Sequence, residues 1–196
     1  MLDGVVNIVH DIFNNKRARS ILLKLRYPIC LVCLIILIPQ IKPAWFLPGF
    51  IISLFGELIQ LWCFASLDKN KTLAAKGLYM LMRNPMYIGR FFLLLGCLVL
   101  TGNIWVVLVF AVLYYFYMVN RVKREEAKLR VVFGQVYEDY CRDVNRFVPS
   151  FKGSDRRSLW FFKWDLLLEN NGHWNLLAVL VCYIVFYFLA FIYSTP

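Results

Sequence analysis

The basic residues of this chain are gathered into three stretches that alternate with apolar segments. Of the 22 lysines and arginines, 21 lie in stretches that hold five, five and eleven of them: residues 16–26, 69–90 and 121–163. In membrane proteins, loops rich in Lys and Arg face the cytoplasm. The connectors at residues 39–48 and 101–103, whose one basic residue is Lys42, are therefore expected on the other side. The pattern predicts a polytopic membrane protein with an odd number of spans, a cytoplasmic N-terminus and a C-terminus on the opposite side.

The composition agrees with a membrane environment, because 61% of the residues are hydrophobic and 17% are aromatic, more than a soluble core needs. A helix that crosses about 30 Å of hydrocarbon needs roughly 20 residues. The predicted spans are residues 27–41, 48–67, 85–100, 104–120 and 174–193. The third and fourth form a tight hairpin. We expect an all-α membrane bundle of about five helices, divided into an interfacial N-terminal segment (1–26), a core (27–172) and an additional C-terminal helix (173–196).

Several classes of function are not expected. The net charge of +10 follows from the membrane topology, and no basic helix with base-reading side chains stands apart, so we expect no nucleic-acid partner. The lipid bilayer is the expected partner of this positive face. The six cysteines are scattered, which implies no disulfide framework, and His10 and His173 have no neighbouring ligands, so no metal site is predicted. The oligomeric state is not specified by these patterns.

One ionisable residue, Glu57, lies near the middle of a predicted span. An intramembrane carboxyl is a candidate functional group, although packing against other helices is the more common role. Gly49, Ser53, Gly56 and Gln60 share its helix face at spacings of three and four, so this face should look toward other helices. Glu57 and Gln60 are the candidate substrate-pocket residues within the membrane.

Two polar blocks flank the predicted hairpin, at residues 76–90 and 124–149. Pro85 suits the first turn of a helix, and it pushes Asn84 toward an extended conformation. Free N–H groups at such a helix start can hold an anion. In the second block, Glu125 and Glu126 continue the fourth span beyond the membrane. Both blocks are predicted at the same, cytoplasmic, face.

Together the two blocks resemble the integral-membrane methyltransferases typified by isoprenylcysteine carboxyl methyltransferases, with phospholipid methyltransferases as more distant relatives. The family pattern is roughly GxYxxxRHPxYxG, a hydrophobic hairpin, and then EExxLxxxFGxxYxxYxxxVxRxxP. The residues that match it are Gly77, Tyr79, Arg83, Pro85, Tyr87, Gly89, Glu125, Glu126, Leu129, Phe133, Gly134, Tyr137, Tyr140, Val144, Arg146 and Pro149. The chain departs from the pattern at Asn84, where the family has histidine, and in its extra C-terminal span.

The resemblance implies methyl transfer from S-adenosylmethionine to a lipophilic acceptor that arrives from the bilayer. The implied catalytic residues are Glu125, Glu126 and Arg146. The implied cofactor-binding residues are Gly77, Tyr79, Arg83, Asn84, Pro85, Tyr87, Gly89, Glu125, Glu126, Tyr137 and Tyr140. Glu125 or Glu126 would bind the cofactor's amino group, and Arg83 or Arg146 its carboxylate. Asn84 keeps a donor and an acceptor but cannot titrate, so it could not take over a proton-handling role of the family histidine.

Different acceptors and classes remain open at this stage. O-methylation of a carboxylate needs no general base, and the second block favours it; N-methylation of a phospholipid needs a base, for which Glu125, Glu126 and Glu57 are candidates. Membrane sterol reductases share a block similar to the first motif but use NADPH. A non-catalytic membrane protein would keep the spans without needing the paired motifs.

Overall fold

The protein is a bundle of long helices with short loops between them. The computed structural model describes residues 10–11, 13–68, 73–150 and 156–191, and among these it contains no strand. The described helices are α2 (Lys16–Lys24), α3 (Arg26–Leu37), α4 (Phe46–Ser66), α5 (Pro85–Val99), α6 (Ile104–Phe133), α7 (Gln135–Asp143), α8 (Arg156–Leu159), α9 (Trp164–Glu169) and α10 (Gly172–Phe191), with 3-10 turns η1 (Ile38–Gln40), η2 (Pro43–Trp45) and η3 (Gly77–Met80). The predicted all-α membrane bundle is confirmed. Residues 1–9 and 12 of the predicted interfacial N-terminal segment lie outside the described residues.

The described part of every predicted span is mainly helical, but the helices differ in length. Within the described residues, α4, α6 and α10 are each long and apolar enough to cross a membrane alone. Helix α5 has only 15 residues, and α2 and α3 form a pair bent by 67° that gives one further span if the two count together. Integral-membrane character therefore rests on three long apolar helices, while the count of five spans stays a prediction.

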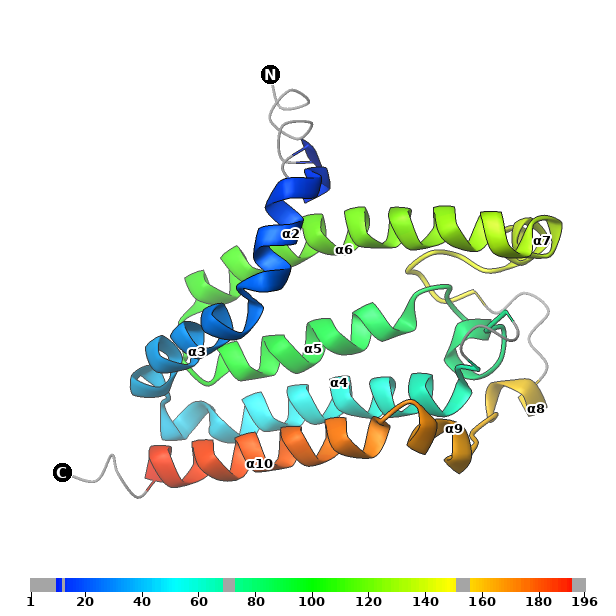
Figure 1. Cartoon of the computed structure of the whole chain (residues 1–196). Helices are drawn as coiled ribbons and strands as arrows, with labels where there is room; N and C mark the ends of the chain where they lie inside the picture. The colour runs from blue at the N-terminus through cyan, green and yellow to red at the C-terminus, as the bar shows by residue number, and fades with distance from the viewer. Residues whose placement is uncertain (1–9, 12, 69–72, 151–155, 192–196) are drawn as a thin grey trace.

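Helices α6, α5, α4 and α10 lie side by side in that order, and α2 with α3 crosses them at a steep angle (Figure 1). The closest contact is between α4 and α5. A Cβ placed on Gly56 would lie 2.5 Å from the carbonyl oxygen of Gly89, and one on Gly89 would lie 2.9 Å from that of Gly56. Small residues at a membrane-helix interface let the backbones approach this closely. The predicted inward face of α4 is confirmed, because all five of its members are buried: Gly49, Ser53, Gly56, Glu57 and Gln60.

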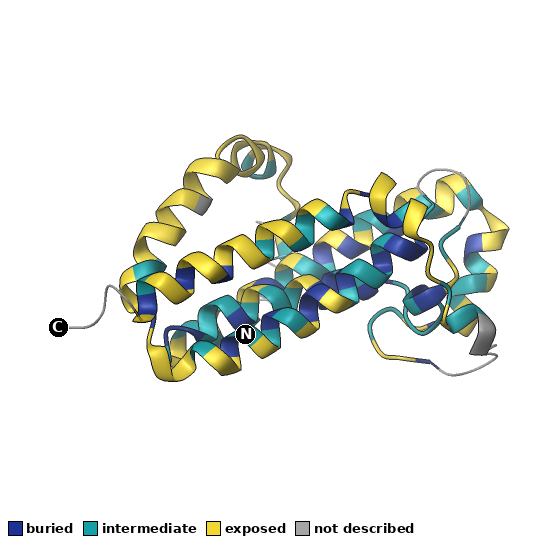
Figure 2. Ribbon diagram, turned by 90° about the horizontal axis from the view of Figure 1, so that it is seen from below, coloured by how far each residue is buried: buried dark blue, intermediate teal, exposed yellow. Residues whose placement is uncertain are grey.

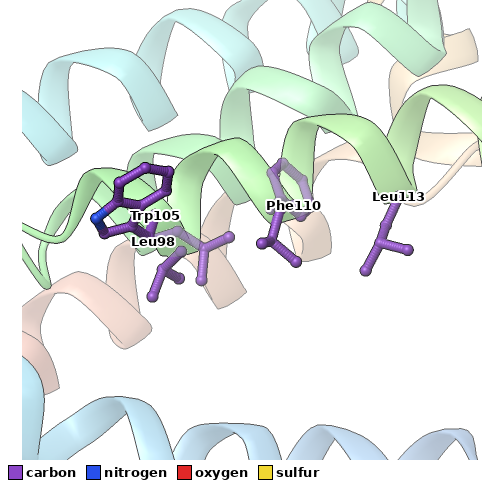
Figure 3. Close-up of a pocket in the computed structure, with 6 residues that line it drawn as sticks. Leu98, Trp105, Phe110 and Leu113 are labelled. Atoms are coloured by element: carbon purple, nitrogen blue, oxygen red, sulfur yellow. The ribbon is translucent and has the colours of Figure 1, made fainter.

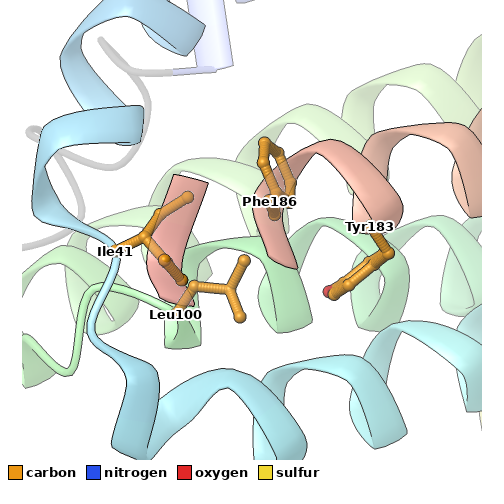
Figure 4. Close-up of a cluster of buried hydrophobic side chains, with 5 residues drawn as sticks. Ile41, Leu100, Tyr183 and Phe186 are labelled. Carbon is orange, nitrogen blue, oxygen red and sulfur yellow. The ribbon is translucent and has the colours of Figure 1, made fainter. Parts of the chain in front are cut away.

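Helix α10 packs against the other side of α4. The Tyr183 hydroxyl lies 2.6 Å from Ser53 Oγ and 3.1 Å from the carbonyl oxygen of Gly49, so its one hydrogen can be donated to either. Around it lies a buried hydrophobic cluster made by Ile41, Leu100, Tyr183, Phe186 and Ala190, which joins α10 to the loop before α4 and the end of α5 (Figure 4). The additional C-terminal helix is thus an integral part of the bundle.

Exposed tryptophans mark both ends of this bundle. Trp45 and Trp105 lie where α4 and α6 begin, and we call this the hairpin end because the turn from α5 to α6 is there. Trp160, Trp164 and Trp174 lie at the opposite end, beside the last turn of α4 and the first turn of α10. Helix α4 separates the two groups by 21 residues, or about 31 Å, close to the thickness of a hydrocarbon core. Tryptophan is enriched at both membrane interfaces, so the spacing fits a bilayer.

The outer surfaces of α3, α6 and α10 are mainly exposed, and buried residues lie along the contacts within the bundle (Figure 2). One cavity of about 440 Å³ opens on this outer surface near the hairpin end (Figure 3). Its lining is hydrophobic throughout: Leu98, Trp105, Val106, Val109, Phe110 and Leu113. Such a surface suits lipid chains and offers no group for chemistry.

Candidate active site

The first motif begins immediately beyond the end of α4. Gly77 opens η3 against the side chain of Ser66, with no room for a Cβ. Tyr79, in the same turn, is buried, and Pro85 begins α5 as its first residue. Asn84 is the residue immediately before α5 and is 9% exposed. The predicted helix start at Pro85 is confirmed, and it presents Arg83 and Asn84 at one end of the bundle, which we call the site end.

The second motif lies directly beside the first. Gly134, with φ of +52°, lets the chain turn from α6 into α7, and the segment after α7 then runs back along the first motif. Met82 and Asn145 form a parallel backbone bridge, and the amide of Arg83 donates to the carbonyl of Asn145 at 2.9 Å. Tyr140 also donates its hydroxyl to the carbonyl of Tyr79. Two blocks separated by a hairpin in sequence therefore form one structural unit.

Glu126 lies at the centre of this unit. Its side chain is 1% exposed and receives two hydrogen bonds from Arg146, with Nη2 at 2.6 Å from Oε2 and Nε at 3.1 Å from Oε1. Arg83 Nε lies 3.6 Å from Oε1, and the Asn84 amide donates to the same oxygen at 3.3 Å. A buried carboxylate needs such partners to offset its desolvation. Glu126 thereby joins residues from both motifs. The cluster of Arg83, Arg146 and Glu126 carries one net positive charge.

Glu125 has a different environment although it is the next residue. Its side chain is 40% exposed, accepts a hydrogen bond from the Tyr87 hydroxyl at 2.7 Å and pairs with Arg121 at 3.3 Å. Successive residues point about 100° apart around an α-helix, so the two glutamates serve different surfaces. Glu126 is enclosed by its own chain, whereas Glu125 keeps access to solvent and to a ligand.

Three tyrosines surround the unit. Tyr137 is fully buried, and the rings of Tyr137 and Tyr140 lie 6.1 Å apart on α7. Burial raises the pKa of Tyr79, Tyr137 and Tyr140 above the usual range of a phenol, and the charge of Glu126 raises that of Tyr137 further. All three therefore stay neutral at physiological pH and contribute rings and hydroxyl groups.

A cavity of about 550 Å³ adjoins the ion-pair cluster. Arg146 lines it, and the other lining residues come from α6 and from the segment after α7: Tyr115, Val119, Asn145, Phe147 and Val148. The cavity thus has one charged group at a mainly apolar wall. The family pattern includes Arg146 but not the other five residues. Tyr115 and Val119 lie earlier on α6 than the second motif, and the other three lie between positions that the pattern specifies.

The remaining predicted residues lie in packing positions. Gly89 meets Gly56 and Gln60 across the α4–α5 contact, and Pro85 is buried at the start of α5. Glu57 is fully buried between α4 and α10, where it accepts a hydrogen bond from Asn175 at 2.7 Å and one from Gln60 at 3.4 Å. Neither Glu57 nor Gln60 lines the 550 Å³ cavity. Asn175, the hydrogen-bond partner of Glu57, lies 118 residues from it and is not part of the family pattern.

Comparisons with known proteins find similar sequences over part of the chain. The family model described as phospholipid methyltransferase matches residues 47–136. The chain is 34% identical over 82 residues to a protein-S-isoprenylcysteine O-methyltransferase of Schizosaccharomyces pombe, a match that covers 42% of this chain and 35% of that protein. It is 30% identical over 129 residues to protein-S-isoprenylcysteine O-methyltransferase A of Arabidopsis thaliana, covering 59% of this chain and 66% of that one, and 30% identical over 112 residues to the mouse enzyme of the same name, covering 57% and 37%. No solved structure matches.

The fold and the site define a polytopic membrane protein with a polar centre built from two motifs at one end of its helices. The matches support a superfamily for that class. The chain is similar to the integral-membrane methyltransferases of the isoprenylcysteine carboxyl methyltransferase-like and phospholipid methyltransferase families. The matched region spans roughly one third to two thirds of the length of these relatives.

Proposed function

We propose that this chain transfers a methyl group from S-adenosylmethionine to an amphiphile in the membrane, and that the accepting group is a carboxylate. The observation that supports it most is the cavity beside Arg146, whose lining is apolar apart from one guanidinium, one amide and one phenol. An amphiphile with an anionic end has the same distribution of polarity. The relatives' names specify O-methylation of isoprenylcysteine, a lipid-bearing residue whose carboxylate would be the accepting group.

The residues present fit the cofactor. When bound, S-adenosylmethionine supplies an electrophilic methyl group on a sulfonium. Glu125, partly exposed, is the carboxylate best placed to receive an ammonium group, because Glu126 already accepts bonds from Arg146 and Asn84. Arg83 Nε is buried 3.6 Å from Glu126 Oε1, so Arg83 adds a second positive charge beside the site that would favour the carboxylate of the cofactor. Tyr140 of α7, which is partly exposed whereas Tyr79 and Tyr137 are buried, offers a flat face for an adenine ring.

The charge around the cavity favours a carboxylate acceptor over an ammonium acceptor. Arg83 and Arg146 outnumber Glu126, so the cluster attracts an anion and repels a cation. A carboxylate is already ionised at neutral pH, and no residue has to remove a proton from it. An amine acceptor would have to lose a proton to a base before or during transfer.

The chain's own groups would then act mainly by positioning. Arg146 would hold the acceptor carboxylate, while Tyr115, Val119, Phe147 and Val148 would hold the apolar part. Holding two reactants in line is a major source of rate enhancement for direct displacement. The site end would face the cytosol, where the cofactor is made and where the basic stretches are expected.

Phospholipid N-methylation is the second candidate. The family model carries that description, and Glu125 is an exposed carboxylate that would take the proton from an amine. The two reactions leave chemically different products. A methyl ester releases methanol in alkali, whereas an N-methyl group is stable.

The experiment is therefore methyl transfer from S-adenosylmethionine labelled in its methyl group, by the full chain reconstituted in vesicles. The vesicles contain either an S-prenylated cysteine with a free carboxylate or phosphatidylethanolamine. We expect alkali-labile, volatile label with the first acceptor, and none with the same acceptor whose carboxyl is converted to an amide. Alkali-stable label in phosphatidylethanolamine would favour the second candidate. Absence of S-adenosylhomocysteine binding by calorimetry would contradict both.

A further inference from the structure

A short loop of aromatic residues is fixed to the site end of α4. We call residues 160–164 the aromatic loop. The carbonyl of Phe161 accepts hydrogen bonds from Trp62 Nε1 at 3.2 Å and from Ser66 Oγ at 3.0 Å, and the amide of Lys163 donates to the carbonyl of Ala65 at 3.1 Å. Three bonds to the last two turns of a spanning helix hold this backbone at a defined level of the bundle.

This fixed backbone presents large rings outward. Trp160 and Trp164 are 73% and 70% exposed, and Phe162, 5.1 Å from Trp164 between ring centroids, is 39% exposed. Adjacent exposed rings on an ordered backbone form an apolar surface that water disfavours. Trp174, in the first turn of α10, is exposed at the same end of the bundle. The surface therefore lies at the level where a membrane interface would cover it.

Two ammonium groups accompany the rings. Lys76 Nζ lies 5.0 Å and Lys163 Nζ 5.4 Å from the centroid of Phe161, so both cations gather at one ring. Lys76 comes from the loop before η3, whereas Lys163 belongs to the aromatic loop itself. The two ammonium groups come from separate segments and meet at the ring of Phe161, so they place positive charge beside the exposed rings.

We propose that the aromatic loop and Lys76 form a binding surface for the headgroups of anionic phospholipids. The rings of Trp160, Phe162 and Trp164 enter the interfacial layer, and the two ammonium groups contact lipid phosphates. Amphipathic rings favour this layer, and lysines near an anionic surface strengthen binding. The proposal concerns the lipid surroundings and is independent of methyl transfer. Since Lys76 directly precedes Gly77, a headgroup held there would lie next to the first motif.

The test measures which lipid surrounds the two tryptophans. The full chain is placed in vesicles of phosphatidylcholine with about one third phosphatidylglycerol, a fraction high enough for strong interfacial attraction. Bromine, which quenches tryptophan fluorescence, is carried near the top of the acyl chains of only one lipid at a time. The chain has six tryptophans. The fluorescence of the aromatic loop is therefore the difference between the fluorescence of the natural chain and that of Trp160→Phe/Trp164→Phe.

We expect brominated phosphatidylglycerol to quench the loop signal more, per mole, than brominated phosphatidylcholine. Each lysine near an anionic surface favours binding about fivefold, so Lys76→Gln/Lys163→Gln should remove most of the preference. The control Lys24→Gln/Lys128→Gln removes the same total charge as Lys76→Gln/Lys163→Gln, at positions far from the loop in sequence. It should keep the preference for phosphatidylglycerol. Raising the salt concentration should weaken the preference in the natural chain.

Three results would overturn the proposal. Equal quenching by both lipids would remove the anionic preference, and unchanged preference in Lys76→Gln/Lys163→Gln would remove the role of these lysines. Absence of quenching by either lipid would mean that the rings are covered by water or by another protein rather than by the bilayer. None of these readouts requires an active enzyme or a known acceptor.

Discussion

Arg146 and Glu126 lie 20 residues apart in the chain and meet in a two-point ion pair, with Arg146 Nη2 2.6 Å from Glu126 Oε2 and Arg146 Nε 3.1 Å from each carboxylate oxygen. The pair fastens the segment after α7 to α6. Since Arg83 and Asn84 contact the same carboxylate, the pair also holds the first motif in place. Stability and ligand binding at the site end should therefore depend together on Glu126.

We expect Glu126→Gln to destabilise the protein by about 3 kcal/mol, because it removes the buried counter-charge of Arg83 and Arg146, whose side chains are 12% and 35% exposed. The matched control is Glu138→Gln, which breaks the exposed pair with Arg130 (2.8 Å) and should cost less than about 1 kcal/mol. Heat unfolding of both variants, followed by tryptophan fluorescence, measures the difference. Equal unfolding midpoints would show that the Glu126 cluster does not contribute more than a surface pair.

Glu125→Gln should weaken S-adenosylhomocysteine binding roughly tenfold to hundredfold, the loss expected when one charge-assisted bond is removed. Its effect on heat unfolding should be small, since the Glu125 side chain is 40% exposed. Calorimetric titration of the detergent-solubilised protein gives the affinity. Asp139→Asn, which alters an exposed pair with Arg142 on α7, is the control and should bind normally. Unchanged binding in Glu125→Gln would refute this residue's role while leaving the proposed reaction open.

Asn84→His tests the departure from the family pattern. The Asn84 amide donates to Glu126 Oε1 at 3.3 Å, a bond that an imidazole N–H can replace. If hydrogen bonding is all that this position supplies, the natural chain is active and Asn84→His changes the rate of methyl transfer only modestly. Product formed by Asn84→His but not by the natural chain would instead point to a titrating group as the requirement. The labelled-methyl assay in both proteins distinguishes the two.

The tyrosine environment predicts loss of stability in alkali. The folded-state pKa values of Tyr79, Tyr137 and Tyr140 lie above those of the unfolded chain, near 10. Their contribution is therefore fully present below about pH 10 and declines as the pH rises above it, because only the unfolded chain ionises there. Tyrosinate absorbance and unfolding midpoints measured between pH 9 and about pH 11.5 should change together for the natural chain. Tyr137→Phe should reduce the pH dependence, and an unaltered profile in that variant would contradict the prediction.

The topology has a direct test in whole cells. From the distribution of basic residues we expect a cysteine at position 128 to react with a membrane-impermeant reagent only after the cytosol is opened, and one at position 194 to react in intact cells. The background for Lys128→Cys and Ser194→Cys is the chain with its six natural cysteines replaced by serine or alanine. Reaction of position 194 only from the cytosolic side would refute an odd number of spans.

The sequence predicted the helices and the inward face of α4 because both follow from local spacing. It also predicted that the two motifs would share one face, since the hairpin between them returns the chain to the same end. It could not separate Glu125 from Glu126. The two are adjacent and chemically identical. The difference arises from the segments before α5 and after α7, whose Arg83, Asn84 and Arg146 contact Glu126. The link between Glu57 and Asn175 was likewise beyond a local pattern, because it depends on how α10 packs against α4.

The tryptophans at the two ends of the bundle bear on which acceptors can react. Rings anchored at both interfaces would resist movement of the protein along the membrane normal, and Arg146 would then keep a constant height relative to the hydrocarbon. An acceptor, by contrast, carries its carboxylate at a height set by the number of bonds between that group and its lipid tail. The bundle would in this way act as a ruler, selecting acceptors by the length of the spacer as well as by charge.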